Sequence, residues 1–273
     1  MRRLVPASLG AFLSAVLIAL PAAPAAATMR EQPLEWKVGE GTFSGVLVYD
    51  DASAAVRPGL VMVPNWMGVT DTAVARAKDV AGADYVVLVA DVYGKGQRPA
   101  DSAQAQAQVG KVYADGGTTV RERVAAAVAT LKAQSGTAPV DASRIGAFGF
   151  CFGGGAVLEL ARTGADLAGV VSVHGDLGTY LPPSATGVRA SVLVLNGADD
   201  TSVTDAHIAA FEKEMDGLGA DWQFVNFSGA RHCFSQPENR PTDPKDNCRY
   251  DERASRRAFA MLRGFFQERF ARP

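Results

Sequence analysis

The 273-residue sequence is poor in cysteine and histidine, with three of each. So few cysteines exclude a small disulfide-rich scaffold, although an odd number leaves at least one thiol outside any pairing. An excess of charge of one sign is also lacking, because 27 Lys and Arg face 29 Asp and Glu and the formal net charge is −2. The sequence therefore gives no electrostatic basis for binding nucleic acid or another charged polymer.

Long apolar runs are lacking too, since the apolar stretch that Pro6 and Pro21 bracket is shorter than the roughly 20 residues that a helix needs to cross a bilayer, which disfavours the alternative of a membrane anchor. The apolar stretch Phe12–Leu20 follows Arg2 and Arg3 and leads into small residues that end at Ala27. This order of basic, apolar and small-residue segments is typical of a secretory signal peptide. We therefore expect residues 1–27 to be removed and the mature protein to be exported, periplasmic or secreted, with no membrane attachment after cleavage.

Patterns typical of strands and helices alternate along the rest of the chain. Residues 36–49 alternate between apolar and polar or small side chains, which predicts an antiparallel hairpin near the N-terminus. Short, nearly continuous apolar runs follow, as expected for parallel strands that helices cover on both faces. These runs are Leu60–Val63, Tyr85–Ala90, Ile145–Phe148, Val170–Val173, Val192–Leu195 and Phe224–Phe227.

Apolar residues recur at helical spacing between these runs and after the last one. Thr119 and Glu122 precede the first of these stripes at the spacing of a capping box, and the Ala- and Gln-rich stretch 102–108 suits a short surface helix or lid. The stripes span Val120–Leu131, Ile208–Leu218 and Phe259–Phe266. The alternation predicts an α/β fold with a mostly parallel central sheet flanked by helices, in a single domain over residues 28–273.

A Gly-Phe-Cys-Phe-Gly-Gly segment centred on Cys151 follows the predicted strand Ile145–Phe148 and precedes a helical segment. This order matches the G-x-S-x-G nucleophile elbow, with cysteine in place of serine. The sharp turn requires glycine neighbours, and the N-terminus of the following helix favours the thiolate. A buried structural cysteine beside a glycine-rich turn is the alternative interpretation.

Of the histidines that follow both Cys151 and an acid at the end of a strand, only one lies in a loop after a predicted strand. This residue is His232, which we expect to be the catalytic base because nucleophile, acid and histidine occur in this order in the fold that uses the elbow. The acid is expected in the Asn-Gly-Ala-Asp-Asp segment after a strand, where Asp200 is preferred and Asp199 is the alternative. His207 lies off its apolar helix stripe and is expected at the surface.

The chain resembles the dienelactone hydrolase family of α/β-hydrolases in three segments that occur in the same order as in the family, 149–154, 197–200 and 229–232. The segments 91–96 and 173–175 also resemble it, and the likeness covers nearly the whole mature chain. It implies an α/β-hydrolase fold and a hydrolase of small carboxylic esters or lactones, with Cys151, Asp200 and His232 as the triad and a thioester intermediate. No metal or organic cofactor is expected. The expected partner is a small-molecule substrate and the expected state a monomer, although the sequence does not fix the oligomeric state.

The same resemblance implies an oxyanion hole from the backbone N–H groups of Trp66 and Phe152. Asn65 stands where the family usually has a glutamate that holds the resting thiol, and an amide cannot take up that proton. We expect the side chains of Asn65, Tyr93 and His174 to line the substrate site.

The other two cysteines lie near the predicted base. Cys233 directly follows His232, and Cys248 lies further along a polar loop. In an oxidising compartment a disulfide between them would restrain the loop that positions His232, whereas two free thiols are the alternative.

Two other functions compete with the hydrolase hypothesis. One is a thiol redox protein that uses Cys151, although the sequence has no C-x-x-C motif. The other is an exported binding protein that keeps the fold without catalysis, for which Asn65 is the only indication.

Overall fold

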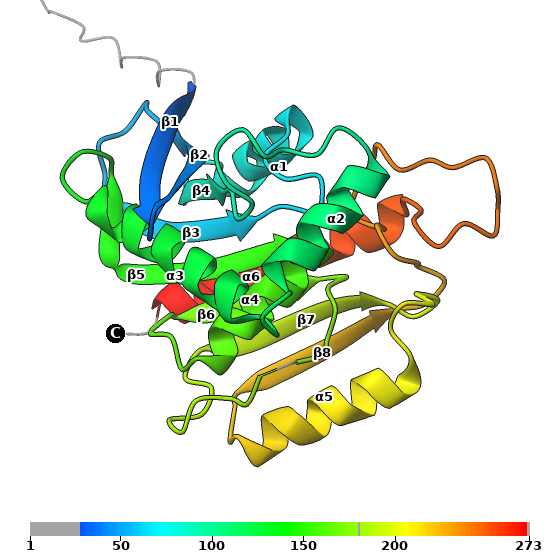
Figure 1. Ribbon diagram of the computed structural model, residues 1–273. Helices are drawn as coiled ribbons and strands as arrows, with labels where there is room; N and C mark the ends of the chain where they lie inside the picture. Colours follow the sequence, from blue (N-terminus) through cyan, green and yellow to red (C-terminus); the bar gives the residue numbers. More distant parts are fainter. Residues whose placement is uncertain (1–27, 180, 272–273) are drawn as a thin grey trace, which may run out of the picture.

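The computed structural model describes residues 28–179 and 181–271, so the predicted signal peptide at 1–27 lies outside the described residues. An eight-stranded sheet of order β1-β2-β4-β3-β5-β6-β7-β8 forms the centre of the protein (Figure 1). The strands are β1 (Met29–Val38), β2 (Gly41–Asp50), β3 (Arg57–Val63), β4 (Val86–Ala90), β5 (Val140–Phe150), β6 (Gly169–Val173), β7 (Ser191–Gly197) and β8 (Trp222–Phe227).

The sheet is mostly parallel, as predicted. β1 and β2 form the expected antiparallel hairpin, with Gly39 at a φ of 53° in its turn, and β2 is also antiparallel to β4. The pairs from β4 through β3 to β8 are all parallel. The six apolar runs coincide with β3 to β8, and every residue of β3, β4, β6 and β7 is buried.

Helices cover both faces of the sheet (Figure 1). One apolar core packs α1 and α6 against the sheet, and the other packs α3, α4, α5 and the end of α2 against its opposite face. No helix within the described residues is long and apolar enough to cross a membrane. The helices are α1 (Asp71–Ala81), α2 (Ser102–Val112), α3 (Thr118–Ala133), α4 (Phe152–Arg162), α5 (Asp205–Gly217) and α6 (Glu252–Ala271).

The start of α3 differs from the prediction. The N-cap is Gly117, and no side chain caps the helix there, so the predicted capping box at Thr119 and Glu122 is wrong. Asp115 instead accepts hydrogen bonds from the N–H (2.9 Å) and the hydroxyl (2.6 Å) of Thr119. The carboxylate therefore satisfies a first-turn donor from outside the helix.

The parallel strands place the candidate residues at one edge of the sheet. The carboxyl ends of parallel strands meet at the same edge, where ligands bind in open α/β sheets. Asn65 and Trp66 follow β3, Cys151 follows β5, His174 follows β6, Asp200 follows β7 and His232 follows β8.

Candidate active site

Cys151 occupies the junction between β5 and α4. Its backbone has φ 53° and ψ −119°, a conformation that residues with a Cβ rarely adopt. Its N–H donates to the carbonyl of Val173 over 3.0 Å, which ties the turn to the neighbouring strand β6. The half-buried thiol is free and lies at the N-terminus of α4, where the helix dipole favours a negative charge.

The glycines around Cys151 allow this turn to pack. A Cβ added at Gly149 would lie 2.1 Å from the carbonyl oxygen of Gly153, and one added at Gly153 would lie 2.0 Å from that of Val63. Both distances are far below van der Waals contact, and both partners are backbone atoms that cannot move aside. The glycine pattern of the segment is therefore a steric requirement of the elbow.

His232 connects Cys151 to Asp200. Its Nε2 lies 3.1 Å from Sγ of Cys151, and its Nδ1 lies 2.7 Å from Oδ2 of Asp200. The side chain of Asp200 is fully buried, whereas Asp199 is exposed. The structure therefore brings the three predicted triad residues into one line of hydrogen bonds and leaves Asp199 outside it.

Hydrogen bonds favour the charged forms of both Asp200 and His232. Burial of the Asp200 carboxylate opposes its ionisation, but hydrogen bonds from His232, Asn247 and Ser202 outweigh burial and lower the pKa of Asp200 to about 2. Burial also favours a neutral His232 ring, yet hydrogen bonds to Asp200 and Cys151 and the charges of both raise the pKa of His232 to about 10. The imidazolium form is therefore favoured at neutral pH.

The backbone N–H groups of Trp66 and Phe152 are the predicted oxyanion donors. Among the described residues, neither the N–H of Trp66 nor that of Phe152 has a hydrogen-bond partner. The hydroxyl of Tyr93 donates to the carbonyl of Trp66 over 3.0 Å, and its ring stacks on Phe152 with centroids 5.4 Å apart. Tyr93, only 6% exposed, thus packs behind the two donors.

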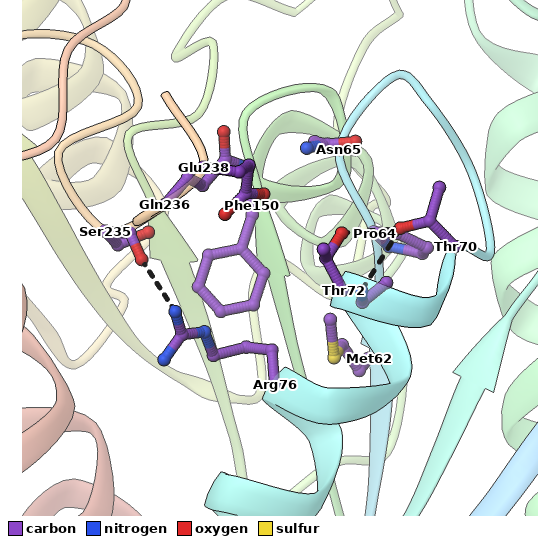
Figure 2. A pocket seen from close by; sticks show the side chains of 11 residues that line it. Met62, Pro64, Asn65, Thr70, Thr72, Arg76, Phe150, Ser235, Gln236 and Glu238 are labelled. Atoms are coloured by element: carbon purple, nitrogen blue, oxygen red, sulfur yellow. Dashed lines mark hydrogen bonds between the residues drawn. The ribbon is translucent and has the colours of Figure 1, made fainter. Parts of the chain in front are cut away.

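Asn65 adjoins a small cavity. Its Oδ1 accepts the N–H of Met67 over 2.9 Å, which fixes the side chain within its own turn. Figure 2 shows Asn65 and Glu238 among the side chains that line the cavity, and Arg76 donating to the carbonyl of Ser235. The cavity measures about 30 Å³, and Cys151 and His232 are not among its lining residues.

His174 lies beneath His232 and is completely buried, so its ring does not reach the substrate side in this structure. The two imidazole rings are 5.1 Å apart, and Nε2 of His174 lies 2.8 Å from the hydroxyl of Ser235. Burial, and then the charge of His232, hold the pKa of His174 well below its usual value. A neutral His174 thus supports the loop that carries His232. The third histidine, His207, is exposed on α5, as predicted.

The loop after His232 contains one predicted contact and one that the sequence did not indicate. The structure joins Cys233 to Cys248, as predicted, and leaves Cys151 as the free thiol. Asn247 donates from Nδ2 to Oδ1 of Asp200 over 3.0 Å. No periodic pattern or motif marks an asparagine in such a loop, and only its position beside a cysteine could have drawn attention to it.

Fold, elbow and strand-end residues together define an α/β-hydrolase. The model of the dienelactone hydrolase family matches residues 43–270, and the chain belongs to this family. It is accordingly a hydrolase that acts on ester or lactone bonds.

Three proteins are similar to this chain over half or more of its length. A dienelactone hydrolase-like promiscuous phosphotriesterase, P91, from metagenomic libraries is 33% identical, with a TM-score of 0.80 over 89% of this chain and 99% of that one. A probable 2-oxo-3-(5-oxofuran-2-ylidene)propanoate lactonase from Bradyrhizobium sp. is 28% identical over 66% of this chain and 74% of that protein. The uncharacterized protein K02A2.1 from Caenorhabditis elegans is 32% identical over 52% of this chain and 91% of that protein.

Proposed function

We propose that the protein hydrolyses small carboxylic esters or lactones through a thioester on Cys151. The hydrogen-bonded line from Cys151 through His232 to Asp200, with distances of 3.1 and 2.7 Å, is the observation that supports this proposal most strongly. A cysteine paired with an imidazole that a buried carboxylate orients is the arrangement used in covalent acyl transfer.

In the first half-reaction the Cys151 thiolate attacks the carbonyl carbon and forms a C–S bond. The carbonyl oxygen becomes an oxyanion that accepts hydrogen bonds from the N–H groups of Trp66 and Phe152. When the tetrahedral intermediate collapses, the C–O bond of the ester breaks. Nε2 of His232 gives its proton to the leaving oxygen, which in a lactone stays attached to the acyl group.

In the second half-reaction His232 acts as a base. It removes a proton from water, which attacks the thioester carbonyl, and collapse releases the acid and the thiolate. The resulting imidazolium lies between the thiolate and the Asp200 carboxylate, so the resting ion pair is restored.

The competing functions have less support. Cys233 and Cys248 bond to each other, so Cys151 has no partner cysteine for a thiol redox cycle. A binding protein without catalysis would not require the strained backbone of Cys151 or the buried Asp200 beneath His232.

The proposal is tested with p-nitrophenyl esters and lactones of several acyl sizes. Cys151→Ala and His232→Ala should each lower kcat by more than about 10³-fold, because loss of a triad nucleophile or base in a serine hydrolase costs roughly 10⁶. His207→Ala makes the same change at an exposed histidine on α5 and should keep turnover near wild type. A phosphotriester belongs in the panel because P91 is a promiscuous phosphotriesterase.

Acid-quenched reactions analysed by mass spectrometry should locate the acyl group on the peptide that contains Cys151. Full ester turnover by Cys151→Ala, or an acyl group on another residue, would show that the assignment is wrong.

A further inference from the structure

The residue that precedes each disulfide cysteine contacts the same carboxylate. His232 comes before Cys233 and meets Oδ2 of Asp200, whereas Asn247 comes before Cys248 and donates to Oδ1. The backbone pairs the two segments as well, in a bridge between His232 and Cys248. The disulfide therefore joins the two pieces of chain that hold the two oxygens of Asp200.

The amide of Asn247 has a fixed orientation. Its Oδ1 accepts the N–H of Thr201 over 3.0 Å, and its Nδ2 donates to Oδ1 of Asp200 and to the hydroxyl of Ser202, each over 3.0 Å. The reversed orientation would place the amide oxygen against the carboxylate and the amide nitrogen against a backbone donor. Asn247 therefore presents an N–H group to the buried acid.

Little else holds the segment that carries Asn247. Residues 237–247 contain no helix or strand, and none of their side chains is buried. Arg231 donates to the carbonyls of Pro244 and Asp246, and Arg249 donates to those of Pro241 and Asp243. Three of these four hydrogen bonds are exposed, so water can replace them. The covalent bond at Cys248 is thus the strongest restraint on the position of Asn247.

We propose that Asn247 is a positioning residue for Asp200 and that the Cys233–Cys248 disulfide keeps it in place. This inference rests on the function proposed above, in which Asp200 orients the base. Reduction of the disulfide by a dithiol, which is itself oxidised to a cyclic disulfide, yields two thiols and releases the segment. Turnover then falls while the sheet stays folded.

Substitutions of Asn247 test its role directly. Asn247→Ala should lower kcat about tenfold with little change in KM, since a hydrogen bond to a charged group contributes on the order of 1.5 kcal/mol. Asn239→Ala is the matched control, because Asn239 lies in the same loop and donates to Gln236 rather than to the triad. Equal kcat in Asn247→Ala and wild type would overturn the proposal.

Asn247→Asp separates hydrogen bonding from loop structure. It keeps the shape of the side chain but places a second carboxylate beside Asp200 at high pH, where like charges repel. At low pH the new carboxyl is protonated and can donate as the amide does. The activity relative to wild type should therefore rise as the pH falls from 8 to 5, and a ratio that does not change with pH would contradict the role.

The disulfide is tested by the double variant Cys233→Ala, Cys248→Ala, with folding followed by circular dichroism. Its kcat should fall at least as far as that of Asn247→Ala. Adding Asn247→Ala to it should then cost clearly less than in wild type, because residues that act together are not additive. If the combined variant loses kcat by the product of the two separate factors, the disulfide does not act through Asn247.

Alkylation of Cys151 by iodoacetamide distinguishes failure of this proposal from failure of the proposed function. The rate at pH 6 reports the thiolate, which the His232 imidazolium stabilises, and it needs no ester substrate. Asn247→Ala should slow alkylation about threefold, because an imidazolium that Asp200 holds less firmly beside Cys151 stabilises the thiolate less. If wild type turns over no ester, a slowed variant still supports the positioning role, and an unchanged rate rejects it.

Discussion

Cys151 shows at the scale of one residue how the fold maintains a reactive group. Its backbone conformation, with φ 53° and ψ −119°, costs on the order of 1–3 kcal/mol for a residue with a side chain. The strand β5 before it, the helix α4 after it and the hydrogen bond to Val173 together impose that conformation. This conformation raises the sulfur of Cys151 from the sheet edge toward Nε2 of His232.

The pKa shifts of Asp200 and His232 predict how stability depends on pH. The pKa of Asp200 is lowered to about 2, so its contribution is present above its ordinary value of about 3.8 and is lost as the pH falls toward 2. The pKa of His232 is raised to about 10, so its contribution is complete below its ordinary value of about 6.5 and is lost as the pH rises toward 10. The unfolding free energy of wild type should therefore exceed that of Asp200→Asn most clearly between about pH 3.8 and pH 6.5, where both contributions are complete.

Urea unfolding of both proteins from pH 3 to pH 10 measures this difference. Asp221→Asn is a suitable control, because Asp221 is an exposed acid paired with Arg269 and precedes β8, whereas His232 follows the other end of that strand. A difference between wild type and Asp200→Asn that stays constant across the whole range would contradict the pKa shifts.

At the residue scale the sequence was sufficient to select Cys151, Asp200 and His232, which the structure brings within hydrogen-bonding distance of one another. Each follows a strongly apolar strand, and glycines or chain order mark each position. Asn247 was missed because its role depends on a tertiary contact with a loop 47 residues away in sequence. His174 was expected to line the substrate site, but its complete burial beneath His232 depends on packing that no local pattern reveals.

The elbow between β5 and α4 is an element whose backbone leaves no room for a side chain. Gly153→Ala should abolish folding or activity, since its Cβ would lie 2.0 Å from the carbonyl oxygen of Val63. Gly264→Ala in α6 is the matched control, because nothing lies within 4 Å of its Cβ, and it should stabilise the protein by about 0.5–1 kcal/mol. Thermal unfolding and soluble yield measure both, and a stable, active Gly153→Ala would refute the steric argument.

Strands were easier to predict than helices in this chain. The parallel strands are buried on both faces, so their sequences are continuous apolar runs with distinct ends. α1 was not predicted because its buried face consists of Val74, Ala77, Val80 and Ala81, in which alanine gives a weak apolar signal. The cap of α3 was misplaced because a carboxylate outside the helix, Asp115, replaced the expected local box.

At the scale of the whole molecule we propose that the chain is exported after loss of residues 1–27. The disulfide near the C-terminus supports this proposal, since such bonds persist in oxidising compartments. Expression of the full chain in a bacterium with a periplasm should give a mature protein that begins at Thr28 and is released by osmotic shock. Intact mass and N-terminal sequencing measure this, and a cytoplasmic protein that retains Met1 would contradict it.

The separation of the triad along the chain has a consequence for biogenesis. His232 follows Cys151 by 81 residues, and Cys248 lies still nearer the C-terminus. A growing or translocating chain therefore carries its thiol long before it has a base, an acid partner or a disulfide to hold them. A growing chain that includes Cys151 but is shorter than 232 residues has the thiol without the base, and the proposed catalytic centre and its disulfide can assemble only after residue 248 has been made.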